Sequence, residues 1–172
     1  MYILTERRMC NDCDTYFTKK INVRKEHKVK NILLNKYKEP QTCDKIPEGS
    51  CDKYRPDFVW DNGLNITILE VDENAHRTYA CECEQARMVN ISQDFGGIPV
   101  IWVRFNPDSY TDNFGKKHRG NINSRMDKVV EVLKNCEEYR PIGLMSIIYM
   151  YYDGYKVNVN NVDNISLECV GL

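Results

Sequence analysis

Three carboxylates and a histidine lie close together in this chain, and side chains of these types suit chemistry at a phosphate group. They are Asp57, Glu70, Asp72 and His76. Carboxylate oxygens are the ligands that Mg²⁺ prefers, and a neutral imidazole can accept a proton from water or donate one to a leaving group. The residue types therefore predict a Mg²⁺ (or Mn²⁺) site held by the three carboxylates, with the histidine as general acid or base.

A hairpin is predicted to bring these side chains together. Two strand-like runs, 57–60 and 65–72, flank Asn62-Gly63, which is a strong signal for a tight turn. A two-residue loop at this turn would place Asp57 opposite Ile68. Because side chains alternate along a strand, the predicted shared face carries Asp57, Ile68, Glu70 and Asp72.

The rest of the chain predicts one sheet flanked by helices. Apolar residues at helical spacing predict helices over 22–37, 79–95 and 124–138. Apolar runs predict further strands over 99–105, 144–152 and 155–159. The order strand, helix, strand predicts a parallel pair. We expect an α/β fold with a mixed β-sheet, formed by a single domain over residues 1–172 that includes an N-terminal Cys-containing segment, 1–21.

Charge and hydropathy limit the partners of the chain. The net charge of −1 gives no global attraction to nucleic acid or to an anionic membrane. Basic residues are nevertheless concentrated in two segments, 19–38 and 116–125, which suit either a solvated surface or contacts with phosphates. No apolar run approaches transmembrane length and no signal peptide opens the chain, so we expect an intracellular protein, in the cytoplasm or nucleus.

Four of the eight cysteines have a spacing that suits a structural zinc site. They are Cys10, Cys13, Cys43 and Cys51. Two residues separate the first pair, as in many zinc sites, whereas the gap within the second pair is wide for this purpose. The same cysteines also suit buried thiols, and the sequence leaves both interpretations open.

The acidic stretch resembles a family of nucleases. Its run Arg-Pro-Asp-Phe, then Ile-Leu-Glu-Val-Asp-Glu with a histidine shortly after, then Cys-Glu-x2-Arg-Met, is similar to the PD-(D/E)XK superfamily. Within it, the run is most similar to very-short-patch-repair endonucleases and EDxHD homing endonucleases, a branch with uncharacterised members in large DNA viruses and algae. The resemblance implies a restriction-endonuclease-like core, DNA as partner, Mg²⁺-dependent hydrolysis of phosphodiester bonds, and a virus-infected host cell as one location.

The resemblance also implies roles for individual residues. Asp57 matches the acidic residue of the Pro-Asp element, and Glu70 matches the second acidic residue. Glu26 matches a carboxylate on the leading helix. The lysine expected two residues after Glu70 is replaced by Asp72, and His76 matches the histidine that takes over part of its role in the EDxHD branch.

Two candidate residues and the function itself keep alternatives. Arg87 suits either a bidentate contact with phosphate or an ion pair with Glu84 on the same helix. Glu26 suits either the site or a surface position that balances neighbouring lysines. The expected function is a metal-dependent DNA endonuclease, as a monomer or a homodimer. The alternatives are a catalytically inactive nucleic-acid-binding module and a zinc-stapled interaction protein.

Overall fold

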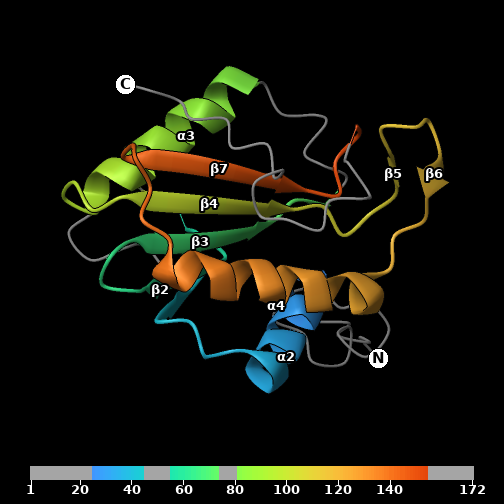
Figure 1. The fold of residues 1–172 in the computed structure, drawn as a ribbon, viewed down its shortest axis with the longest axis horizontal. Coiled ribbons are helices and arrows are strands. Elements are labelled where there is room, and N and C mark those ends of the chain that lie inside the picture. Colours follow the sequence, from blue (N-terminus) through green and yellow to red (C-terminus); the bar gives the residue numbers. More distant parts are fainter. Residues whose placement is uncertain (1–24, 45–54, 74–80, 155–172) are drawn as a thin grey trace, which may run out of the picture.

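The protein is built on a central mixed sheet. The structure, a computed structural model, describes residues 25–44, 55–73 and 81–154, without the side chains of 81–84. The five-stranded sheet has the order β1-β2-β3-β4-β7 (Figure 1). Its strands are β1 (Thr42–Cys43), β2 (Phe58–Asp61), β3 (Ile66–Val71), β4 (Val100–Phe105) and β7 (Met145–Met150). The pairs β1–β2 and β2–β3 are antiparallel, whereas β3–β4 and β4–β7 are parallel.

Helices lie on both faces of this sheet (Figure 1). The helices are α2 (Lys25–Lys36), α3 (Cys81–Asp94) and α4 (Ile122–Glu138), and a small hairpin of β5 (Tyr110–Thr111) and β6 (Lys117–His118) lies between β4 and α4 in the chain. The predicted α/β class, the mixed sheet flanked by helices and the parallel pair β3–β4 are confirmed. The predicted strand over 155–159 lies outside the described residues. No described helix is long and apolar enough to cross a membrane.

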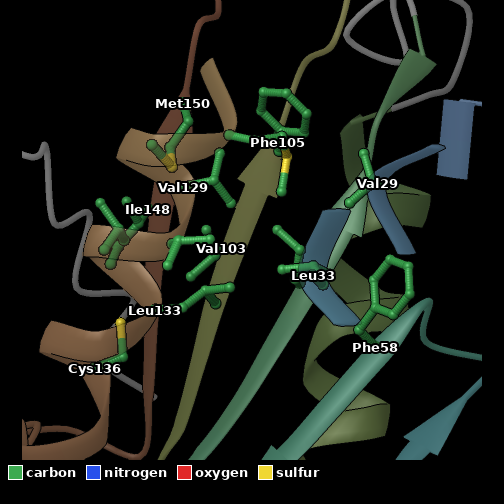
Figure 2. Close-up of a cluster of buried hydrophobic side chains, with 14 of the residues drawn as sticks. Val29, Leu33, Phe58, Val103, Phe105, Val129, Leu133, Cys136, Ile148 and Met150 are labelled. Atoms are coloured by element: carbon green, nitrogen blue, oxygen red, sulfur yellow. The ribbon is translucent and has the colours of Figure 1, made fainter. Parts of the chain in front are cut away.

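One face of the sheet is largely apolar, with Thr67 and Ser146 as its buried polar residues. The helices α2 and α4 cover it, and both present apolar residues at helical spacing to the strands. Figure 2 shows Val29 and Leu33 of α2 and Val129 and Leu133 of α4 directed at this face, and all four are fully buried. The predicted apolar stripes of these two helices are therefore the ones that form the main core.

The opposite face is apolar over only part of its length. The helix α3 covers this face through the buried side chains of Met88 and Ile91. A row of apolar residues crosses the strands beneath it: Val59, Ile68, Trp102 and Ile147. The next row on the same face, toward the carboxyl ends of the parallel strands, holds Glu70, Arg104 and Tyr149. Polar side chains therefore gather at one end of one face.

The β2–β3 hairpin has a wider loop than the sequence predicted. Asp61 pairs with Ile66, and Val59 rather than Asp57 lies opposite Ile68. The register is thus shifted by two residues from the prediction, which brings Asp57 level with Glu70. Since a shift by two keeps every side chain on its own face, the predicted shared face survives the error.

Asn65 explains the wider loop. Its side chain donates hydrogen bonds to the carbonyls of Cys136 and Tyr139, 2.8 Å each, where α4 ends. Its own carbonyl accepts from the amide of Asn62 at 2.9 Å and closes the loop. The tight turn that was predicted needs a positive φ at both central residues, but of the two only Gly63 has one, at 78°.

Candidate functional site

The polar end of the α3 face brings the predicted carboxylates together. Glu70 lies near the end of β3, beside Arg104 of β4 in the register of the sheet. Asp57 directly precedes β2, and because β2 runs antiparallel to β3 it reaches the same end of the sheet. Asp72 follows β3 by one residue. The parallel strands β3 and β4 end at the same end of the sheet, and the antiparallel strand β2 begins there. The strand directions therefore bring these side chains together.

Glu70 is held by an arginine from the helix above it. Arg87 of α3 donates from Nη2 to Oε1 of Glu70 at 3.0 Å and from Nη1 to Oε2 at 3.4 Å. Its Nη2 also donates to the carbonyl of Arg55 at 3.4 Å. Arg87 thus makes a two-pronged contact with Glu70 on the sheet; the predicted contact with a phosphate stays a prediction, and the side chain of Glu84 lies outside the described residues.

Burial and neighbouring charges raise the pKa values of Asp57 and Glu70. Burial raises the pKa of Asp57 to about 7, and the charges of Glu26 and Asp72 add to the rise, although the amide of Val71 donates to its Oδ2 at 2.8 Å and opposes it. Burial raises the pKa of Glu70 to about 8, with the charge of Asp57 as the next cause and Arg87 opposing it. Two adjacent carboxyl groups therefore hold protons near neutral pH, the usual result of crowding like charges away from water.

Asp72 has a different environment. Arg104 donates from Nε to Oδ2 at 2.6 Å and from Nη2 to Oδ1 at 2.9 Å, and the hydroxyl of Tyr152 also donates to Oδ2. The Asp72 side chain is fully buried and that of Arg104 nearly so. Asp72 was predicted as a metal ligand, but both of its oxygens are bound by these donors, so the arrangement is that of a buried ion pair.

Glu26 lies near this site, on the helix α2 that covers the opposite face of the sheet. It is partly buried on the first turn of α2, close enough to Asp57 for its charge to raise the pKa of that residue. The start of α2 is fixed at the end of β3, because the Lys25 amide donates to Oε1 of Glu73 at 3.2 Å. The position agrees with the site interpretation of Glu26 better than with that of a balancing surface charge.

Several candidates lie outside the described residues. These are His76, Cys10, Cys13 and Cys51. Cys43 is described: it lies in β1, partly buried, and packs against the apolar core under α2 and α4. Within the described ranges, no group of three or more His, Cys, Asp or Glu side chains is arranged to hold a metal ion. Of the three expected Mg²⁺ ligands, Asp57 and Glu70 lie level with each other at one end of the sheet, whereas Asp72 is bound by Arg104 and Tyr152.

The two basic segments are only partly free surface. Arg125, counted in the second segment, is buried and donates to the carbonyls of Asn106, Asp108 and Arg119 at 2.7–2.9 Å. Its assignment to a phosphate-contacting surface is therefore wrong, because its donors are bound to the backbone. In the first segment, Lys36 forms an ion pair with Asp127 at 2.6 Å.

Sequence reasoning missed two residues of the site, Arg104 and Tyr152. A signal for Arg104 existed, since a charged residue inside the apolar run of β4 requires a buried partner of opposite charge. Tyr152 carried no comparable signal. Comparisons with known proteins add nothing further, because the chain matches no protein-family model, no curated protein and no solved structure. Residue chemistry and geometry therefore carry the functional proposal.

Proposed function

We propose that this protein is a metal-dependent endonuclease that hydrolyses phosphodiester bonds in DNA, built on a restriction-endonuclease-like core. The observation that supports it most strongly is the crowding of Asp57 and Glu70. They lie side by side on neighbouring strands, largely removed from water, with their pKa values raised to about 7 and about 8. Such a pair is destabilising by itself, and a divalent cation would relieve the repulsion.

The donor set fits Mg²⁺ or Mn²⁺. Mg²⁺ is usually held by one or two carboxylates, with waters and substrate phosphate oxygens completing its octahedron. Asp57 and Glu70 are two hard oxygen donors in adjacent register positions and would be the residues that hold the ion. When bound, the ion would supply neutralisation of the phosphate charge and activation of a water molecule for attack.

The remaining residues of the site would position the substrate and the carboxylates. Arg87 has a planar, two-pronged donor and lies within reach of Glu70, so it would donate to a phosphate oxygen entering beside that carboxylate. Asp72, Arg104 and Tyr152 form a closed network that fixes the end of β3, and with it the backbone on which Glu70 lies. His76 keeps its expected role as proton donor or acceptor at the leaving group or the water.

One observation favours a second function. The same ion pair between Arg87 and Glu70 that suits substrate binding also neutralises a carboxylate which a metal ion would need. If that pair persists with DNA present, the protein binds nucleic acid without cutting it. This second candidate is the catalytically inactive binding module, and it shares the fold and the basic surface with the first.

Plasmid cleavage tests the proposal directly. Supercoiled plasmid incubated with the wild-type protein and Mg²⁺ or Mn²⁺ should be nicked or linearised, and EDTA should stop the reaction. Glu70→Gln should lower the rate at least about 10²-fold, because a ligand charge is lost while the shape is kept.

The matched control is Glu131→Gln on the exposed side of α4, which makes the same chemical change far from the site and should cleave like the wild type. Intact plasmid with either metal, from a protein that still binds the DNA, would favour the inactive module. Undiminished cleavage by Glu70→Gln would refute the proposed site.

A further inference from the structure

A small basic hairpin projects beyond the carboxyl ends of β4 and β7. Figure 1 shows β5 and β6 standing apart from the body of the sheet at that end. At the tip of the hairpin, Phe114 exposes 73% of its surface. The candidate site lies at the same end of the sheet, since Arg104 and Asp72 are located where β4 and β3 finish.

The tip of the hairpin is held rigidly by Asp112. Its Oδ1 accepts from the amides of Phe114 and Lys116 at 2.8 and 2.9 Å, and its Oδ2 contacts Nε2 of His118 at 2.8 Å. Several contacts lower the pKa of Asp112, and the hydrogen bond with His118 is the largest of these causes. Asp112 is buried, and Gly115 supplies the positive φ of 81° that the turn requires. The exposure of Phe114 is therefore imposed by a fixed turn.

The base of the hairpin is anchored equally firmly. The ring of Tyr110 stacks on His118 with centroids 4.8 Å apart and an interplanar angle of 10°. The guanidinium of Arg125 lies over the rings of Tyr110 and Tyr151 at 5.0 and 4.7 Å. Thr111 binds the segment after β7, through its amide to Oδ1 of Asp153 at 2.8 Å. The hairpin thus presents its tip in one orientation relative to the sheet.

The exposed surface of the tip combines an aromatic ring with positive charge. Lys116, Lys117 and Arg119 are exposed beside Phe114, whereas the acidic residue of the turn is directed inward. Among the described aromatic side chains, Phe114 exposes the largest fraction of its surface. Proteins bind single-stranded nucleic acid with this combination: the cationic groups contact the phosphates, and the aromatic ring stacks on a base.

We infer that the β5–β6 hairpin binds DNA beside the candidate site by stacking Phe114 on a base that is not part of a continuous duplex stack, with the adjacent cationic side chains contacting the backbone. This inference rests on the proposed function and specifies its substrate: DNA with an unpaired or terminal base near the cleavage point. Ordinary duplex DNA keeps its bases stacked on each other and offers the ring no such face.

The test is equilibrium binding by fluorescence anisotropy in EDTA, where no cleavage occurs. The full chain is titrated into a labelled blunt duplex and into the same duplex with a single-stranded extension. Phe114→Ala should weaken binding to the extended probe about 5- to 100-fold, the range of one lost base–aromatic stack. It should change binding to the blunt duplex less than about threefold, as for an ordinary surface substitution.

Three further variants separate the contributions. Phe114→Leu keeps an apolar side chain without a ring and should bind the extended probe as weakly as Phe114→Ala. Replacing Lys116 and Lys117 together by alanine should weaken binding to both probes alike, since phosphate contacts do not depend on base stacking. Ile142→Ala, at a fully exposed apolar position before β7 at the other end of the sheet, should leave both affinities unchanged.

The outcomes separate this inference from the function on which it rests. Unchanged affinity of Phe114→Ala or Phe114→Leu for the extended probe, with wild-type protein that binds and cleaves DNA, would overturn the stacking role alone. Equal loss of affinity for both probes would overturn the preference for an unstacked base. No binding of either probe by the wild type would remove DNA as the substrate as well.

Discussion

Two acidic groups at the same end of the sheet differ in how their charge is balanced. Asp72 is fully buried, yet Arg104 and Tyr152 supply three hydrogen bonds to its two oxygens. Asp57 and Glu70 instead lie against each other and share a single arginine, Arg87. The first group has the design of a structural ion pair. The second is a crowded, largely buried pair whose ionisation the fold opposes, as the raised pKa values show.

This difference indicates which carboxylate is structural and which carboxylates are candidate metal ligands. All three acids share one face and one short stretch of sequence, so position alone does not distinguish them. Partners do: Arg104 and Tyr152 donate three hydrogen bonds to the buried Asp72, whereas Asp57 and Glu70 crowd each other and would gain from a cation that relieves their repulsion. Replacing an acid by its amide should therefore have opposite effects on stability in the two groups.

The largest expected effect on stability comes from breaking the ion pair between Asp72 and Arg104. Asp72→Asn removes the carboxylate charge that faces the buried guanidinium of Arg104, so it should lower the free energy of unfolding by about 3–5 kcal/mol, measured by chemical denaturation. Replacing both partners, Asp72→Leu with Arg104→Met, should cost less than the single change, because no charge then stays buried alone. A stability loss below about 1 kcal/mol in Asp72→Asn would contradict the structural role of this pair.

A smaller loss is expected from the hydroxyl that completes the same network. Tyr152→Phe removes one hydrogen bond to the buried carboxyl group of Asp72 and keeps the ring that packs edge-on against Tyr149, with centroids 5.1 Å apart. Its free energy of unfolding should fall by about 1.5–3 kcal/mol in urea denaturation. A variant as stable as the wild type would show that the hydroxyl adds nothing to the balance of Asp72.

Replacing an acid of the crowded pair, Asp57 and Glu70, should instead raise the stability of the protein, by an amount that depends on pH. The pKa of Asp57 rises from 3.8 to about 7 on folding, so the folded protein holds an extra proton between these values. Its contribution to stability is complete below about pH 4 and is lost as the pH rises through about 7. Asp57→Asn should therefore reduce this loss of stability with rising pH. It should raise the free energy of unfolding of the metal-free protein by about 1–2 kcal/mol at pH 8.

The measurement is urea denaturation of both proteins in EDTA at a series of pH values. Glu131→Gln is the control and should follow the wild-type profile, since its carboxylate is exposed on α4. An Asp57→Asn protein that is less stable than the wild type at pH 8 would mean that the carboxylate is a net stabilising group, like Asp72.

The sequence predicted those parts of the fold that rest on repeated local signals. The stripes of α2, α3 and α4 recur over three or more turns, and the α/β order followed from them. The strands β1, β5 and β6 are only two residues long, too short for a period of two to be visible. The hairpin register was wrong because Asn65 binds the end of α4, a contact between residues far apart in the chain.

The acidic residues of the candidate site were predictable from the sequence, and their basic and hydroxyl partners were not. Strand alternation was enough to group Asp57, Glu70 and Asp72, because a period of two does not depend on the register error. Which acid meets which base depends on the placement of α3 over the sheet and of β4 beside β3. Arg87 was thus expected to meet either a phosphate or Glu84 on its own helix, and Arg104 was taken as an ordinary member of an apolar strand.

Cation binding tests the central claim, that Asp57 and Glu70 together form the metal site. Calorimetric titration of the wild-type protein with Mn²⁺ at pH 8, without DNA, should show binding to one site, and Glu131→Gln should behave identically. Asp57→Asn and Glu70→Gln should each weaken that binding more than about 100-fold, beyond the loss caused by changes to residues that merely support a ligand. Wild-type Mn²⁺ affinity in both of these variants would contradict the account.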